Sequence, residues 1–146
     1  MARMNTAEAA PEVYKAFMAA EVAIRKGPLD ATVRELVKIR ASQMNGCLFC
    51  IDMHTGEARK HGETEQRIYN LDAWRESRLF TGAERAALAY VEAVTILDVH
   101  NVTDEIWAEV EKHFDEGERG GLVAISALIN LWNRIAIPTR MQFDQA

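Results

Sequence analysis

The sequence predicts an all-α protein, a helical bundle of about six to seven helices, and three observations support this prediction. Apolar residues recur at helical spacing along most of the 146-residue chain, capping residues precede several of these segments, and strand signals are nearly absent. The three prolines, Pro11, Pro28 and Pro138, lie near expected helix ends. We expect residues 1–146 to form a single domain.

The first half of the chain contains three helical segments with short stop signals between them. Residues 11–26 carry an apolar stripe, and Gly27-Pro28 ends this segment. Asp30 is a suitable N-cap for a second helix, which Asn45-Gly46 ends. A third helix begins around Cys47 and ends at Lys60-His61-Gly62, where cations occupy the last turn.

The second half adds four helical segments. Residues 64–71 form a short one, residues 81–84 match a capping box, and residues 103–105 open another helix. The last long helix spans roughly residues 118–135 and is apolar on nearly every face. Because several helices have wide apolar faces, we favour burial of the surplus against a second copy, although a central core helix explains the pattern too.

Composition excludes some functions. The net charge of −5 provides no basic surface for nucleic acid or an anionic membrane. The longest uncharged apolar stretch, residues 120–133, is shorter than the roughly 18 residues that a membrane span needs, and the N-terminus does not resemble a signal peptide. We expect a cytoplasmic protein, in which a Cys-x-x-Cys pair is catalytic or metal-binding rather than a structural disulfide.

The most informative motif is Cys47-Leu48-Phe49-Cys50, followed by His54. These are the only two cysteines in the chain, and their spacing allows a small disulfide ring to close and reopen. On one helix, Cys47, Cys50 and His54 fall within an arc of about 60°. Cys47 lies near the helix N-terminus, where a thiolate is stabilised, and His54 can take the proton of Cys50 directly or through one water.

Two simpler readings of the motif remain open. The cysteines can be buried apolar side chains and His54 a surface or core residue. Alternatively, Cys47, Cys50 and His54 can ligate zinc, with a carboxylate or one of the other three histidines, His61, His100 and His113, as the fourth ligand. His61 fits better as a cation at a helix C-terminus, and the last two lack a motif context.

Over nearly its whole length the chain resembles the alkylhydroperoxidase D-like branch of the carboxymuconolactone decarboxylase family. The specific element is the spacing Glu-x11-Cys-x2-Cys-x3-His, from Glu35 to His54. Four downstream segments fit the same pattern, residues 62–67, 71–76, 80–89 and 130–134.

The resemblance implies an all-α fold that assembles as homo-oligomers, often trimers or hexamers, and a peroxidase without metal, haem or flavin. It implies that Cys50 attacks the peroxide, that Cys47 closes the disulfide and meets the reductant, and that Glu35 and His54 relay protons. Arg40, Trp74, Trp132, Asn133 and Arg134 fit the family pattern near the site, although both tryptophans also suit the core or an interface.

Glu35 and Phe49 determine how protons are expected to move at this site. Periodicity alone makes Glu35 a solvated carboxylate, whereas the resemblance makes it a base, and its apolar neighbours lead us to expect a raised pKa. Members with peroxidase activity often have a histidine between the cysteines, where this chain has Phe49. Proton transfer must then use Glu35, His54 and water, and activity is expected to be weaker or directed at another oxidant.

The sequence-based hypothesis is a thiol peroxidase with an antioxidant role. His54 and Glu35 lower the effective pKa of Cys50, whose thiolate attacks a hydroperoxide, and Cys47 then displaces hydroxide to form the Cys47–Cys50 disulfide. An external dithiol or protein reductant restores the thiols. The alternatives are a redox adaptor or disulfide reductase with an exposed Cys47, a zinc-binding assembly module, and a lactone decarboxylase that does not need the cysteines.

Overall fold

The protein is helical throughout the part that its structure describes. In the computed structural model, which describes residues 1–142, eight α-helices and one 3-10 helix occur and no strand does. The elements are α1 (Thr6–Ala9), α2 (Pro11–Lys26), α3 (Ala31–Asn45), α4 (Leu48–Lys60), α5 (Glu65–Asn70), η1 (Leu71–Ala73), α6 (Gly82–Thr95), α7 (Asp104–His113) and α8 (Glu116–Thr139). The predicted all-α bundle is confirmed, with the short α1 as the additional helix.

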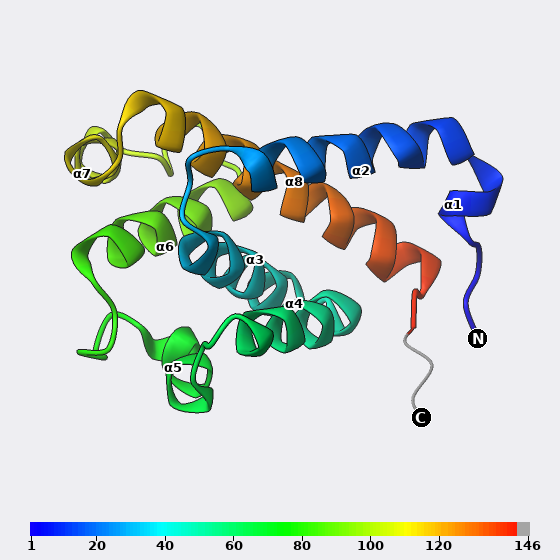
Figure 1. The fold of residues 1–146 in the computed structure, drawn as a ribbon, viewed down its shortest axis with the longest axis horizontal. Coiled ribbons are helices and arrows are strands. Elements are labelled where there is room, and N and C mark those ends of the chain that lie inside the picture. The colour runs from blue at the N-terminus through cyan, green and yellow to red at the C-terminus, as the bar shows by residue number, and fades with distance from the viewer. Residues whose placement is uncertain (143–146) are drawn as a thin grey trace.

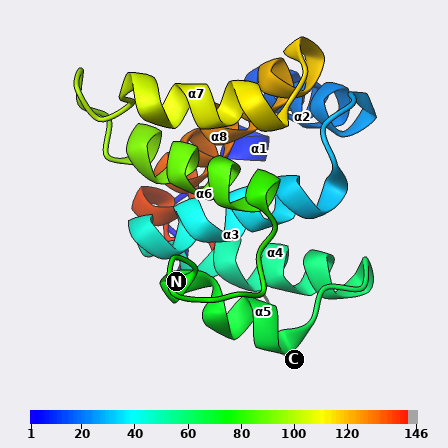
Figure 2. The same cartoon turned by 90° about the vertical axis from the view of Figure 1, so that its left-hand side faces the viewer.

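Helix α3 lies at the centre of the bundle, between α4 on one side and α6 and α8 on the other (Figures 1 and 2). Its apolar side chains Leu36, Val37 and Ile39 are at most 1% exposed. Helix α8 contributes Leu122 and Ile129, both 0% exposed, to the cluster that contains Val37, whereas Leu36 and Ile39 belong to a second cluster. Helix α3 therefore packs into two apolar clusters, and the one that it shares with α8 also contains Cys47 and Cys50.

Helix α8 is longer at both ends than the sequence predicted. Asp115 and Glu118 form a capping box, with both hydrogen bonds 2.8 Å long, so the helix begins at Glu116 rather than at Glu118. Pro138 lies in its last turn, where its missing N–H removes one helical hydrogen bond, and the helix ends at Thr139. By length and composition alone α8 is able to cross a membrane, but its buried residues form the core of the bundle.

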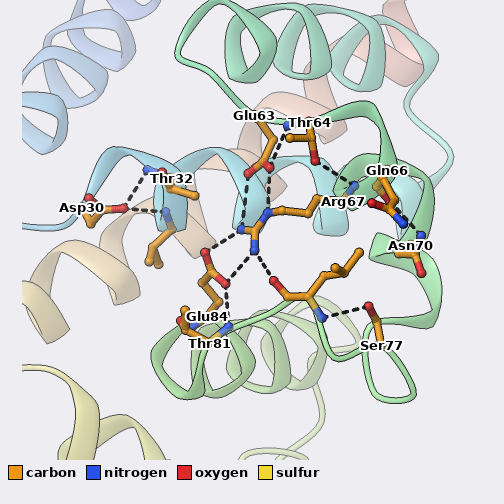
Figure 3. A network of polar contacts seen from close by, with 12 residues as sticks. Asp30, Thr32, Glu63, Thr64, Gln66, Arg67, Asn70, Ser77, Thr81 and Glu84 are labelled. Carbon is orange, nitrogen blue, oxygen red and sulfur yellow. Dashed lines mark hydrogen bonds and ion pairs between the residues drawn. The ribbon is translucent and has the colours of Figure 1, made fainter.

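A cluster of ion pairs and hydrogen bonds around Arg67 connects α5 to the start of α6 (Figure 3). Its guanidinium lies 2.7 Å from the carboxylate of Glu63 and 2.6 Å from that of Glu84, and it stacks 4.9 Å from the ring centre of Phe80. Glu84 also accepts the backbone N–H of Thr81, which completes the predicted capping box. These contacts hold the connection that follows α4 against α6 without involving the cysteines.

Helix α2 is peripheral and has no buried residue. It lies along α8 (Figure 1), where Tyr14 and Phe17 pack edge-to-face on Trp132 with ring centres 5.3 and 5.9 Å away. The indole N–H of Trp132 donates to Glu21 over 3.1 Å. Helix α2 therefore rests on α8 through one aromatic cluster, and this cluster borders the cavity described below.

Candidate active site

The two cysteines lie at the corner between α3 and α4. Gly46 ends α3 with φ +69°, a left-handed conformation that favours glycine, and the backbone N–H of Cys47 donates to the carbonyl of Ser42 over 2.9 Å. Cys47 is then the N-cap of α4, as the motif predicted, and Cys50 lies one turn further. Both are free thiols and 1% exposed, so the corner holds a buried dithiol.

The two thiols differ in acidity. A hydrogen bond from Cys50 lowers the pKa of Cys47 to about 7 despite its burial, helped by the backbone N–H of Cys50 and by Asn133. The pKa of Cys50 is raised, because its thiol donates to Cys47 and because burial and the charge of Cys47 oppose a second anion. The expectation that Cys50 is the acidified thiol is therefore wrong for the resting dithiol: the first thiolate belongs to Cys47.

Glu35 and His54 come together across the α3–α4 interface. Their closest approach is 3.3 Å, from Oε2 of Glu35 to Nδ1 of His54, and Lys38 lies 3.0 Å from the other oxygen of Glu35. Burial acts to raise the pKa of Glu35, but the contacts with His54 and Lys38 outweigh it, and the pKa is lowered. The expected raised pKa is wrong because the sequence pattern did not show these two partners, and Glu35 remains a carboxylate at neutral pH.

The direct hydrogen bond between Cys50 and His54 that the helix spacing allows is not formed. Within the described residues, neither ring nitrogen of the buried His54 has a hydrogen-bond partner that meets distance and angle requirements. Cys50 and His54 instead line one cavity of about 260 Å³, whose other walls are mainly apolar: Tyr14, Met18, Glu21, Arg25, Phe49, Met53, Trp132, Ala136 and Met141. A small molecule in this cavity can contact the sulfur and the imidazole together.

A second, polar cavity shares His54 with the apolar one. It has a volume of about 360 Å³ and is lined by charged residues that include Glu35, Lys38, Arg25 and Arg34. His54 borders both cavities, whereas Cys50 borders only the apolar one and Glu35 only the polar one of these two. The imidazole is therefore placed to pass a proton between the sulfur side and the carboxylate side.

The remaining residues of the family pattern divide between the site and the core. Trp132 lines the apolar cavity, whereas Trp74 is 5% exposed in a separate part of the core and donates to Glu92 over 2.8 Å. Arg40 pairs with the same Glu92 at 2.7 Å. Arg134 is exposed and donates to Asn130. Among these residues, therefore, only Trp132 and Asn133 reach the thiols or their cavity.

The donors proposed for zinc do not converge. Within residues 1–142, no three His, Cys, Asp or Glu side chains are arranged to hold a metal ion. His61 caps the end of α4, with Nδ1 2.8 Å from the carbonyl of Glu57, as expected for a helix C-terminus. His113 is 3.6 Å from Glu109 on α7. The geometry of the described residues does not fit the zinc module.

Sequence reasoning missed Ser42 and Asn45 behind the thiols, whereas the family resemblance had placed Asn133 near the site. Ser42 is 0% exposed and contacts Cys50, and Asn133 contacts both sulfurs. Asn45 bonds to Asn133 from the end of α3 over 2.8 Å. The sequence Ser42-Gln43-Met44-Asn45, directly before Gly46-Cys47, is a usable signal, because amide and hydroxyl groups at the end of a largely buried helix require partners.

Comparisons with known proteins agree with this architecture. Residues 11–93 match the model of the carboxymuconolactone decarboxylase family. The uncharacterised protein YdfG of Bacillus subtilis is 49% identical over 135 residues, which cover 92% of each chain. A structure from Agrobacterium tumefaciens, of a protein of unknown function proposed to be the antioxidant defence protein AhpD, is 39% identical with a TM-score of 0.94 over 100% of both chains.

A more distant structure shares the fold alone. The debrominase Bmp8 is 20% identical, with a TM-score of 0.84 over 96% of this chain and 75% of its own. The same fold therefore occurs in a debrominase, and the fold alone does not determine the activity of this chain. From the family match and the 49% identical relative, the chain belongs to the carboxymuconolactone decarboxylase family, and its fold is that of the AhpD-like branch.

Proposed function

We propose that the protein is a thiol peroxidase that reduces hydroperoxides with Cys47 and Cys50 and has an antioxidant role. The observation that carries the proposal is a buried dithiol, acidified at Cys47, whose Cys50 opens onto an apolar cavity shared with His54. A dithiol that carries one negative charge near neutral pH is a suitable two-electron reductant, because its oxidation to a disulfide releases two electrons.

The reaction follows from the order in which the two thiols ionise. The proton of Cys50 moves along its hydrogen bond to the Cys47 thiolate, and the Cys50 thiolate attacks the terminal oxygen of the hydroperoxide. The O–O bond breaks, and the leaving alkoxide takes a proton from the His54 side and departs as an alcohol. Cys47 then loses its proton and attacks the sulfenic acid at Cys50, which releases water and forms the disulfide. Two thiols and one hydroperoxide give one disulfide, one alcohol and one water.

Phe49 occupies the position where related peroxidases often have a histidine. His54 borders both cavities, as Glu21, Arg25 and Met53 also do, and the carboxylate of Glu35 lies 3.3 Å from its ring. We therefore propose that His54 supplies the proton to the leaving oxygen and that Glu35 restores it from the polar cavity.

The apolar cavity favours an organic hydroperoxide over hydrogen peroxide. Replacing Ala136, a buried wall residue, with leucine fills part of the cavity, so the rate with a bulky organic hydroperoxide should fall about 10-fold or more. The rate with hydrogen peroxide should change less than about 2-fold, because that molecule needs little space. Single-turnover rates followed by loss of free thiols measure both values.

The matched control is Ala127→Leu, which adds the same side chain to an exposed position of α8. It should leave both rates unchanged. Equal losses for both peroxides in Ala136→Leu would mean that the cavity does not admit the substrate, and the organic substrate class would be abandoned.

The redox adaptor is the second candidate, and burial of Cys47 weighs against it. At 1% exposure its sulfur cannot meet a protein thiol without movement of the α3–α4 corner. The same burial means that the reductant of the peroxidase is either a small dithiol that enters the cavity or a protein that binds an opened form. We place the protein in the cytoplasm, where reducing conditions maintain the dithiol.

We also propose a homo-oligomer, such as a trimer or hexamer. Large apolar side chains remain exposed on α2 and α8, with Val13 at 52%, Met18 at 43%, Val123 at 40% and Ile137 at 45%. A second copy of the chain is a suitable cover for such surfaces. Light scattering after gel filtration distinguishes the trimer and hexamer from a monomer.

A further inference from the structure

Three asparagine side chains form a chain of amides behind the dithiol. Asn133 and Asn130, on α8, are 1% and 7% exposed, and Asn45 reaches them from the last turn of α3. Buried amides are retained only where each donor and acceptor finds a partner, and a misplaced amide in a core is destabilising. The direction of every hydrogen bond in this chain can therefore be followed.

The direction is set by a backbone carbonyl, which can only accept. Nδ2 of Asn130 donates to the carbonyl of Ser126 over 2.9 Å and to the hydroxyl of Thr95 over 3.1 Å, so Oδ1 of Asn130 faces the other way. Nδ2 of Asn45 donates to this oxygen over 2.9 Å and to Oδ1 of Asn133 over 2.8 Å. Nδ2 of Asn133 is thereby directed away from Asn45.

The Nδ2 group of Asn133 faces the α3–α4 corner that holds Cys47 and Cys50. Its Nδ2 donates one N–H to the hydroxyl of Ser42 over 3.1 Å, and the remaining N–H faces Cys47 and Cys50, where hydrogen bonding by Asn133 acts to lower both thiol pKa values. The hydroxyl of Ser42 in turn contacts Cys50. A reversed amide would present an oxygen to a negatively charged sulfur, so the orientation imposed by Asn45 is the one that favours a thiolate.

We propose that Asn133 is a catalytic residue whose amide N–H stabilises the thiolate of the Cys47–Cys50 pair, and that Asn45 is the positioning residue that orients this amide. Asn133 neither gains nor loses a proton, and it can follow the negative charge as it passes from Cys47 to Cys50. The catalytic meaning of this role rests on the proposed peroxidase function, whereas its effect on thiol ionisation does not.

The test is a pH titration of the thiolate absorbance in the reduced full-length protein, without peroxide. The wild type should ionise with a pKa of about 7. Asn133→Ala should raise this pKa by about one unit, because a hydrogen bond to a charged group contributes about that much. Asn45→Ala should shift it in the same direction by a smaller amount, since Asn133 keeps its place but loses its orientation.

The matched control is Ser126→Ala, which removes a buried hydroxyl from the same helix and leaves the backbone carbonyl that accepts from Asn130. It should leave the thiol titration unchanged. A folded Asn133→Ala with the wild-type titration would overturn the proposal. Where Asn133→Ala does not fold, as judged by circular dichroism, an unchanged titration in Asn45→Ala overturns it instead. If both variants show the expected rise in thiol pKa but the wild-type protein does not react with peroxide, the peroxidase function is contradicted and the role of Asn133 in thiol ionisation stands.

Discussion

Replacing Cys50 with serine is expected to lower the rate of reaction with an organic hydroperoxide by more than roughly 10³-fold. Cys50 is the only one of the two cysteines that lines the apolar cavity of the described residues, and a serine hydroxyl there cannot form a sulfenic acid. Stopped-flow measurement of the first turnover tests this expectation directly, because it does not require a reductant.

Cys47→Ser is the informative companion variant. It keeps the cavity-facing sulfur, so one hydroperoxide should still be reduced, and a sulfenic acid should accumulate that a dimedone probe traps and mass spectrometry detects. The first turnover should be slower than in the wild type, because the hydroxyl cannot accept the Cys50 proton as a thiolate does. Sulfenic acid on Cys47 in the Cys50→Ser variant would reverse the roles of the two thiols.

Glu35→Gln and His54→Ala are expected to lower the first-turnover rate about 10²-fold each, with little further loss in the double variant. The two side chains are 3.3 Å apart and serve one proton path, so removing either interrupts it. Iodoacetamide alkylation of the thiols at pH 8 should change far less, because the thiolate is stabilised by other groups.

The pH dependence of Glu35 has a defined sign. Its pKa is lowered in the folded protein, so the ionised form stabilises the fold above the ordinary pKa of a carboxyl group, and this contribution is lost as the pH falls through the folded-state pKa. In Glu35→Gln the loss of rate caused by protonation of Glu35 should disappear, whereas the loss caused by protonation of the thiolate should remain, and the stability should fall less steeply in acid.

Glu57→Gln is the matched control for Glu35→Gln, since Glu57 lies on α4 near the polar cavity but is bonded to Lys60 at 2.8 Å on the surface. It should keep the wild-type rate. Equal losses in both variants would indicate a general effect of charge around the polar cavity rather than a relay through His54.

Helix positions could be predicted because local signals determine them. Asp30, Thr64, Thr81 and Thr103 all cap the helices that the sequence assigned to them. The predicted start of α8 at Glu118 is too late, because Glu118 is the third residue of the helix and forms a capping box with the N-cap Asp115. Apolar periodicity therefore predicts which segments are helical, and capping residues determine where the helices begin.

The acidity of the site could not be predicted from the motif. Spacing placed Cys47, Cys50 and His54 on one face of α4, but the order of ionisation depends on which thiol donates to the other and on Asn133, which lies 86 positions after Cys47 in the chain. The pKa of Glu35 likewise depends on the orientation of Lys38 and His54. Such partners are set by packing of α3 against α4 and α8, which no local pattern encodes.

The most direct test of a peroxide-reactive dithiol is the thiol count of the fully reduced, metal-free protein before and after one equivalent of an organic hydroperoxide. The proposed function predicts that both thiols are lost within seconds to minutes, that an intramolecular Cys47–Cys50 disulfide appears in the mass spectrum, and that the Cys50→Ser variant retains its remaining thiol. Two thiols that persist in the wild type under these conditions would contradict the peroxidase and favour the adaptor or a chemistry that does not use the cysteines.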